Sequence, residues 1–240
     1  MESGKLSRTR WTRGIWIVAT VTVIAGFAVS IYLVFISTGI ERNLGFSQKI
    51  FYFHVPCAWI TYLAFGIAAI SSILYLIRNN QVWDSIAYSS IELGTVFTTL
   101  VIVTGPLWAR PTWGAYWVWD ARLTTTLILW LIELSYLLLR AFVEEPEKAA
   151  KYGAVLALLG ALDIPIIHYS VVLWRGMHPV VMQSDAGGGG LPSEFFVALM
   201  ISLATFTLLF FLLLTVRVRL ELVRSRLTNV RNRIFEQGLA

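Results

Sequence analysis

The stretch WGAYWVWDARLTT, residues 113–125, combines residue types that suit ligand binding. Its first ten positions hold three tryptophans, one tyrosine, one aspartate and one arginine, and Trp108 extends the cluster on the N-terminal side. Indole rings offer a broad stacking surface and one N–H donor each, at low rotamer entropy. The cluster therefore suits a large, flat, hydrophobic ligand with a polar edge. Gly114 is expected to permit close backbone approach.

An aromatic belt is the alternative interpretation of this cluster, because Trp and Tyr favour the headgroup level of any membrane protein. A belt spreads around a whole bundle at both faces. Here four of the ten tryptophans lie between residues 108 and 119. This concentration favours a binding platform, with Trp113, Trp117 and Trp119 as its indoles.

Histidines supply the second chemical signal. The chain has three, at positions 54, 168 and 178. Neutral imidazole is a common protein ligand for haem iron, so His54 and His178 could bind the iron from opposite faces. Haem fits the cluster better than a sugar, peptide or lipid, because only haem also requires axial ligands. Taken alone, each histidine is more often a hydrogen-bonded boundary residue.

Charged residues near the cluster could contact the polar edge of a haem. Arg110, Arg122 or Lys49 could pair with the propionates, since an arginine fork matches a carboxylate well. Asp120 precedes an apolar run and is expected either to cap the helix that begins there or to contact a haem ligand. The residues alone leave these two roles open.

The elements that must position these residues are membrane helices. The chain is 57% hydrophobic and 14% charged, well below the roughly 25% charged residues of soluble domains. Six apolar runs each approach the length of about 20 residues that spans a bilayer. They do not alternate as barrel strands do, so an all-α, polytopic membrane protein with six transmembrane helices is predicted. The expected spans are residues 14–37, 55–77, 86–107, 123–143, 153–173 and 194–216.

The distribution of Lys and Arg predicts the orientation. Fourteen of the 19 basic residues fall on the side that holds both termini and the loops near residues 78–85 and 144–152. The positive-inside bias makes that side, with both termini, cytoplasmic. The segment 108–122 is then a periplasmic tryptophan-rich loop, with His54 and His178 near the same face. The segment 217–240 is a basic cytoplasmic tail, for which a lipid-headgroup anchor is favoured over nucleic-acid binding.

Several classes of function lack support in the sequence. Cys57 is the single cysteine, so the chain holds no internal disulfide or CxxC pair. There is no Walker A loop and no GxGxxG motif, and hence no sign of nucleotide binding. Glu92, Glu133 and Asp163 fall inside expected spans, where ionised carboxylates are costly. They mark either a haem or proton path or, by the favoured interpretation, polar contacts between helices.

WGAYWVWD matches a WGxxWxWD signature, and the segments YFHVPCAW, VTGPLWARPTWGAYWVWDARLT and LDIPIIHYSVVLW extend the match. In these residues the chain resembles the haem exporter protein C (CcmC) family. The resemblance implies a single six-helix domain over residues 1–240 that holds haem b at the periplasmic face of the bacterial inner membrane. It implies His54 and His178 as axial ligands, and gives His168 no ligand role. It carries the tryptophan motif onto Trp113, Gly114, Trp117, Trp119 and Asp120.

The resemblance also implies a function. Haem would pass to the periplasmic haem chaperone protein E during cytochrome c maturation, with a small membrane protein D and an ABC transporter of proteins A and B as partners. No covalent catalysis is expected, so the chain is not expected to be an enzyme. Alternatives are a subunit of a cytochrome c haem lyase, a membrane haem transporter, or a b-type electron carrier. The chain departs from the family pattern at Pro179 and in the run DAGGGG at 185–190. Both lie in the third outer loop, which follows the fifth expected span, and they concern how this loop closes over haem.

Overall fold

The computed structural model describes residues 2–42, 44–176, 178 and 191–236. Its six α-helices are α1 (Glu2–Tyr32), α2 (Phe51–Arg78), α3 (Gln81–Trp113), α4 (Ala121–Phe142), α5 (Pro146–Trp174) and α6 (Ser193–Glu236). A π-helical turn, η1 (Leu33–Ser37), and a 3-10 turn, η2 (Phe46–Ile50), join α1 to α2. All six helices are long and apolar enough to span a membrane. The predicted all-α, six-span architecture is confirmed.

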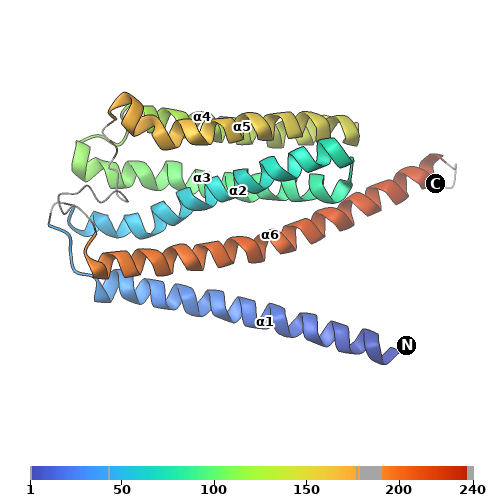
Figure 1. Ribbon diagram of the computed structural model, residues 1–240, viewed down its shortest axis with the longest axis horizontal. Helices are drawn as coiled ribbons and strands as arrows, with labels where there is room; N and C mark the ends of the chain where they lie inside the picture. The colour runs from blue at the N-terminus through green and yellow to red at the C-terminus, as the bar shows by residue number, and fades with distance from the viewer. Residues whose placement is uncertain (1, 43, 177, 179–190, 237–240) are drawn as a thin grey trace.

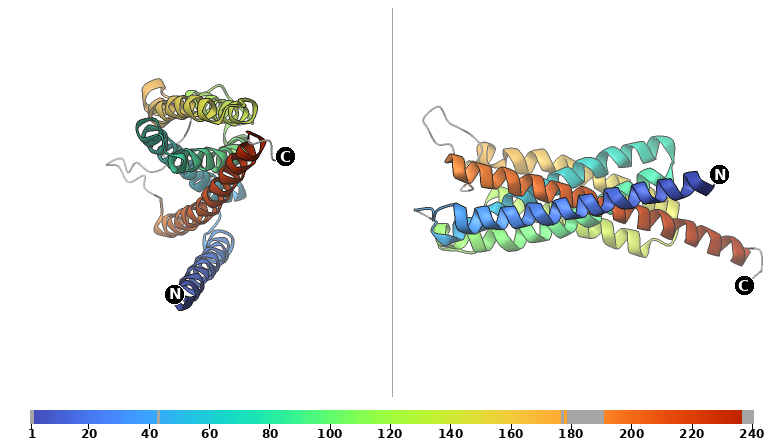
Figure 2. Two further views of the ribbon diagram at one scale, coloured as in Figure 1. Left: turned by 90° about the vertical axis from the view of Figure 1, so that its right-hand side faces the viewer. Right: turned by 90° about the horizontal axis from the view of Figure 1, so that it is seen from below.

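The helices run along one long axis and stack in pairs, α4 with α5, α2 with α3, and α6 with α1 (Figure 1). Figure 2 shows α1 at the edge of the bundle, against α6. The connections α1–α2 and α3–α4 lie at one end, where α5 also ends and α6 begins; we call this the loop end. The first and last helices reach the other end, the termini end (Figure 1). The expected grouping of both termini with the short α2–α3 and α4–α5 connections is thus observed.

The centre of the bundle is α2, which contributes to each of its three large apolar clusters. Small residues let the neighbouring helices come close. A Cβ on Gly160 of α5 would lie 2.3 Å from the ring of Phe65, and one on Gly94 of α3 would lie 3.2 Å from Ala64. Helix association in membranes depends on such close packing. It holds α2 and α3, which carry much of the candidate site, in a fixed relation.

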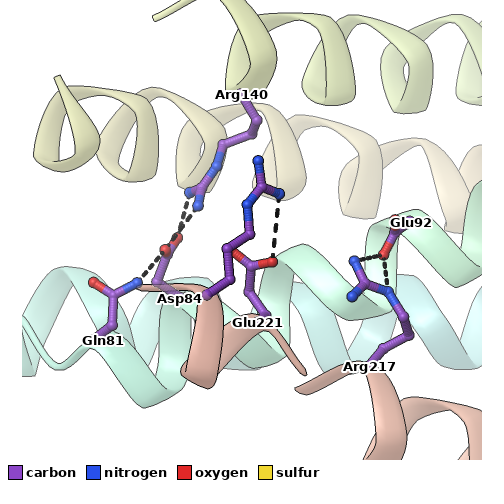
Figure 3. A network of polar contacts seen from close by, with 7 residues as sticks. Gln81, Asp84, Glu92, Arg140, Arg217 and Glu221 are labelled. Carbon is purple, nitrogen blue, oxygen red and sulfur yellow. Dashed lines mark hydrogen bonds and ion pairs between the residues drawn. The ribbon is translucent and has the colours of Figure 1, made fainter. Parts of the chain in front are cut away.

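At the termini end, ion pairs join α3, α4 and α6 (Figure 3). The two terminal guanidinium nitrogens of Arg140, Nη1 and Nη2, donate to Asp84, at 2.5 and 2.8 Å, and Gln81 donates to the same carboxylate. Arg217 on α6 pairs with Glu92 on α3. Glu92 thus serves as an interhelical contact, which agrees with the favoured interpretation of the buried carboxylates.

The other two intramembrane carboxylates are buried. Oε1 of Glu133 accepts a hydrogen bond from Thr98 at 2.8 Å, so this side chain joins α4 to α3. Oε2 of Glu133 and Oδ2 of Asp163 have no hydrogen-bond partner among the described residues. The interhelical role therefore extends to Glu133.

Two expected boundaries differ from the structure. The loop expected at 108–122 is shorter, because α3 continues to Trp113 and α4 begins at Ala121. The segment expected as a tail, 217–240, is helical as far as Glu236. In both places hydropathy marks where the apolar run stops, while the backbone hydrogen-bond ladder continues beyond it.

Candidate functional site

His54 is the fourth residue of α2 and lies at the loop end, near the helix boundary predicted for it. Its side chain is buried, with 7% of its surface exposed. Gly105 on α3 makes room for the ring, because a Cβ there would lie 3.3 Å from Cε1 of His54. The imidazole is therefore held between α2 and α3.

A hydrogen-bond chain sets the tautomer of His54. Oγ1 of Thr104 donates to the carbonyl of Leu100 at 2.6 Å, and it lies 2.9 Å from Nδ1 of His54. A hydroxyl has one proton to donate, so toward the histidine Oγ1 accepts and Nδ1 carries the hydrogen. In the neutral ring Nε2 then bears the lone pair. Such an outer contact orients a metal-ligating histidine and raises its basicity.

Trp108, in the last turns of α3, touches both candidate ligands. Its ring centroid lies 5.7 Å from that of His54 and 6.4 Å from that of His178. The indole is buried, and its N–H has no partner among the described residues. The two histidines, 124 positions apart in the sequence, therefore meet at one indole. Trp113 also contacts His178, at 6.5 Å.

His178 follows α5, which ends at Trp174 with Arg175 in the left-handed conformation as its cap. An Nη1 atom of Arg122 lies 3.2 Å from Nδ1 of His178. A guanidinium can only donate, so Nδ1 accepts, and in the neutral ring the hydrogen is on Nε2. His178 thus has the opposite tautomer to His54.

Arg122 also binds the backbone of α5. Its Nε donates to the carbonyl of Ile167 at 3.3 Å, and Nη2 donates to that of His168 at 2.9 Å. Arg122 therefore ties the first turn of α4 to α5 beside His178. The imidazole of His168 itself is exposed and packs edge-on against Tyr169.

Asp120 is the N-cap of α4, since Oδ1 accepts a hydrogen bond from the backbone N–H of Arg122 at 2.9 Å. The capping role is confirmed. The other oxygen faces Gly176, where a Cβ would lie only 2.3 Å from Oδ2. The absence of a side chain at Gly176 lets the segment leading to His178 pass directly over this carboxylate.

The tryptophan-rich connection starts at Gly114, whose φ of 71° ends α3 in the left-handed conformation. Among the described residues, a Cβ at Gly114 would meet nothing within 4 Å, so the glycine is suited to its positive φ, and the expected close backbone approach stays a prediction. Because α3 ends at Trp113, the four-residue spacing of Trp113 and Trp117 does not place these two indoles on one helical face. Trp117 and Trp119 pack edge to face at 5.8 Å.

The two indoles of this pair differ in exposure. Trp119 is 77% exposed, whereas the N–H of Trp117 is buried without a partner among the described residues. Arg110 is exposed, donates to the carbonyl of Gly114 at 2.6 Å and lies over the ring of Tyr116. The connection thus presents aromatic surface together with a cation.

An open groove of about 530 Å³ runs between the connection and the end of α5. Its lining residues are Val118, Trp119, Asp120, Ala121, Thr125, Trp174, Arg175 and Gly176. Its size falls in the range of roughly 300–1,000 Å³ that is common for small-molecule sites. His54 and His178 do not line it, although Gly176 is two residues before His178. The groove therefore adjoins the histidine pair without containing it.

The comparisons with known proteins point to one family. The family model described as "Heme exporter protein C" matches residues 5–233. A protein of that name from Bradyrhizobium diazoefficiens is 38% identical over 190 residues, 79% of this chain and 72% of its own. Another from Rhodobacter capsulatus is 31% identical over 221 residues, 91% of this chain and 90% of its own. A Marchantia polymorpha protein named "Putative cytochrome c biosynthesis ccmC-like mitochondrial protein" is 35% identical over 160 residues.

The chain belongs to the haem exporter protein C family. In this member the structure brings five of the expected residues into one neighbourhood at the loop end. His178 contacts Trp113 and Arg122, Asp120 caps the helix that carries Arg122, and His54 joins them through Trp108. Trp119 lies on the groove beside Asp120, while Arg110 and Gly114 lie at the end of α3, where the connection begins.

Lys49 is engaged elsewhere. Its Nζ donates to the carbonyl and hydroxyl of Thr38 and to the carbonyl of Gly39, at 2.7–2.9 Å. An ammonium has three donors, and these three contacts use all of them. Lys49 therefore anchors the α1–α2 connection and is not a propionate partner in this arrangement. The departures at Pro179 and 185–190 lie outside the described residues.

Sequence reasoning placed Trp108 in the tryptophan cluster without a contact to the histidines, and it assigned no roles to Thr104, Gly105 or Gly176. One signal was present: residues 101, 104, 105 and 108 share a face of a helix by their spacing. Nothing local indicated that this face would meet His54, because that contact joins residues 50 positions apart.

Proposed function

We propose that this protein binds haem at the loop end of its bundle and passes it on as a carrier in cytochrome c maturation. The observation that carries the proposal is the meeting of His54 and His178 at Trp108. The names of the relatives, which refer to haem export and cytochrome c biosynthesis, support the same role. Haem is the cargo here, and the protein's task is to hold it and release it.

The two histidines would play unequal parts. Nε2 of His54 already bears a lone pair, because Thr104 holds the hydrogen on Nδ1. Nδ1 of His178 accepts from Arg122, which leaves the hydrogen on Nε2. A propionate that drew the guanidinium away would let the ring proton move to Nδ1, so that Nε2 of His178 could bind iron. No net proton is gained or lost in this change of tautomer.

Two buried indole N–H groups that lack acceptors within the described part of the chain are also consistent with haem as the ligand. The buried N–H groups of Trp108 and Trp117 lack partners among the described residues, and a buried donor left unpaired costs about 1–3 kcal/mol. A ligand with carboxylate edges would supply acceptors. Trp113, Trp117 and Trp119 would provide apolar area for the porphyrin, and Arg122 and Arg110 the positive charge. Gly114 and Asp120 would shape the connection, through the end of α3 and the start of α4.

The finer setting is proposed from the basic residues and the family. The termini end would be cytoplasmic, because 14 of the 19 Lys and Arg residues belong to it, and the loop end would face the periplasm of a bacterial inner membrane. The haem would be haem b, bound by two histidines. The receiving protein would be the haem chaperone protein E, with protein D and the ABC transporter proteins A and B in the same assembly. No covalent step is assigned to this chain.

The test is haem titration of the purified full-length protein, followed by Soret absorption. We expect wild-type protein to give a spectrum with two axial histidines, and His54→Ala and His178→Ala each to lose it. Replacing Trp113, Trp117 and Trp119 together by Phe should reduce transfer to the chaperone without impairing membrane insertion. Retention of the two-histidine spectrum in both histidine variants would contradict the ligand assignment. Unimpaired transfer by the triple variant would reduce the cluster to an aromatic belt.

A further inference from the structure

The C-terminal half of α6 extends past the rest of the bundle. The helix has 44 residues and is about 66 Å long at 1.5 Å per residue, whereas a hydrocarbon core is about 30 Å thick. Figure 1 shows its last turns extending beyond α2 to α5 at the termini end and diverging from α1. From Arg217 onward the helix is rich in arginine. A hydrocarbon core accommodates about 20 residues of the helix, so α6 from Arg217 onward extends beyond a core that begins near Ser193.

One face of the extension carries a regular apolar stripe. Leu220, Val223, Leu227, Val230 and Ile234 follow one another at spacings of three and four residues. All five are exposed, by 39–66% of their surface. We call these five residues the α6 stripe. The spacing is that of the a and d positions of a heptad repeat, which form the contact seam of a coiled coil.

Three residues of the α6 stripe also line a groove on the surface of the helix. A shallow groove of about 320 Å³ is lined by Leu220, Val223, Arg224, Leu227, Thr228 and Arg231. Knobs of a partner helix enter holes of this kind, each formed by four residues of the facing helix. The described residues of this chain leave the groove open.

Arginines flank the stripe on both sides. In the heptad register Arg224 and Arg231 occupy e positions, and Arg226 occupies a g position. Arg224 is 73% exposed, and its ion pair with Glu221 of the same helix is long, at 3.9 Å. Nearer the N-terminal end of α6, Arg217 pairs with Glu92 and Arg219 lies over the ring of Trp16. The charges that face a partner are thus of one sign.

This charge pattern indicates which kind of partner can bind to the α6 stripe. Residues at e and g set partner choice through ion pairs between helices. Two copies of this chain, parallel or antiparallel, would place arginine against arginine along the seam, which disfavours pairing. A membrane surface fits less well, because α6 continues without a break from a membrane span and runs on lengthwise past the other helices (Figure 2).

We propose that the α6 stripe is a docking site for an amphipathic helix of a partner protein that carries Asp or Glu at its own e and g positions. The described stripe covers about two heptads, roughly 21 Å, so the contact is short and depends strongly on the charges. The proposal rests on α6 alone and does not depend on haem binding.

A binding assay with designed peptides tests this proposal. Full-length protein in nanodiscs of phosphatidylcholine is titrated with two fluorescent 21-residue heptad peptides that have Leu at a and d. One peptide carries Glu and the other Lys at e and g. We expect the Glu peptide to bind at least tenfold more tightly. Equal binding of the two peptides, or binding of neither, would overturn the proposal.

Matched variants separate the stripe from general charge. Leu227→Asp should abolish binding of the Glu peptide, and Arg224→Glu with Arg231→Glu should reverse the preference toward the Lys peptide. Lys148→Glu with Lys151→Glu makes the same change of net charge at the same end of the bundle and should leave binding unaltered. Loss of binding in this control pair would show that the peptide responds to the overall positive charge at this end of the bundle. That result would overturn the docking site. Circular dichroism and size-exclusion chromatography of each variant check its fold.

Two further measurements test whether the α6 stripe binds lipid or a second copy of this chain instead. Nanodiscs with phosphatidylglycerol should bind the Glu peptide as tightly as those without it, whereas loss of binding there would show that the stripe lies on anionic lipid. A photo-crosslinker at position 227 in native membranes should label a segment with acidic e and g positions, identified by mass spectrometry. Crosslinks only to a second copy of this chain or to lipid would contradict the proposal.

Discussion

Nδ1 of His54 donates a hydrogen bond to Oγ1 of Thr104 across 2.9 Å, from α2 to α3. The direction follows from the second contact of Thr104, whose hydroxyl proton goes to the carbonyl of Leu100. The pair therefore presents Nε2 of His54 as an acceptor before any cargo arrives. A threonine four residues before Trp108 becomes part of the candidate site in this way.

Replacing Thr104 tests this relationship. Thr104→Val keeps the shape and removes the acceptor, so the ring loses its preferred tautomer. Loss of such a contact lowers metal affinity about 10–100-fold, and we expect a similar fall in haem affinity by Soret titration. Thr104→Ser retains the hydroxyl and should bind nearly as wild type. Equal affinities of the Val and Ser variants would show that Thr104 does not orient His54.

Arg122 is expected to matter more than Arg110. Arg122→Ala removes three contacts at once, those to His178, Ile167 and His168, whereas Arg110 is exposed and bound within its own connection. We expect haem affinity to fall at least tenfold for Arg122→Ala and less than threefold for Arg110→Ala, a factor of ten being about 1.4 kcal/mol. The reverse order would make Arg110 the principal propionate partner.

A porphyrin without carboxylates tests whether a propionate must displace Arg122 from His178 before His178 can bind iron. If a propionate must draw the guanidinium away from His178, iron porphyrin dimethyl ester should bind wild-type protein through His54 alone. Arg122→Ala should then restore a two-histidine spectrum with the ester. A two-histidine spectrum of the wild-type protein with the ester would show that His178 is accessible without this exchange.

Gly176 is predicted to be intolerant of a side chain. A Cβ there would lie 2.3 Å from Oδ2 of Asp120, so Gly176→Ala must displace the segment that leads to His178 or disturb the cap of α4. Loss of an N-cap costs roughly 1 kcal/mol, and we expect a lower unfolding temperature together with weaker haem binding. Gly39→Ala is the control, because a Cβ at Gly39 meets none of the described residues within 4 Å. Similar behaviour of the two variants would argue against the close approach.

The ion pair between Asp84 and Arg140 is expected to contribute to stability and not to haem binding. Both side chains are largely buried, with 4% and 11% of their surfaces exposed. Asp84→Asn leaves a buried guanidinium without its counter-charge, a loss of about 3–5 kcal/mol for such pairs. Lys148→Ala, at the exposed pair with Glu145, should cost less than about 1 kcal/mol. Denaturation in detergent measures both, and equal losses would contradict the prediction.

The sequence by itself determined the features that depend on local chemistry. Six apolar runs predict six spans, because each must satisfy its own backbone hydrogen bonds in lipid. The cap at Asp120 follows from its place before an apolar run, and the location of His54 and His178 at one end follows from counting spans. These properties need no contact between distant residues.

Tertiary structure alone decided which residues meet. The contacts of Trp108 with both histidines, of Arg122 with His178, and of Gly176 with Asp120 join segments far apart in the sequence. The same holds for Lys49, which has the charge of a propionate partner but is bound to Thr38 and Gly39. The sequence shows that a cation or an indole is present. Helix packing determines which groups lie within hydrogen-bonding distance of it. The tautomers of the two histidines, and with them their readiness to bind iron, are therefore properties of the folded bundle.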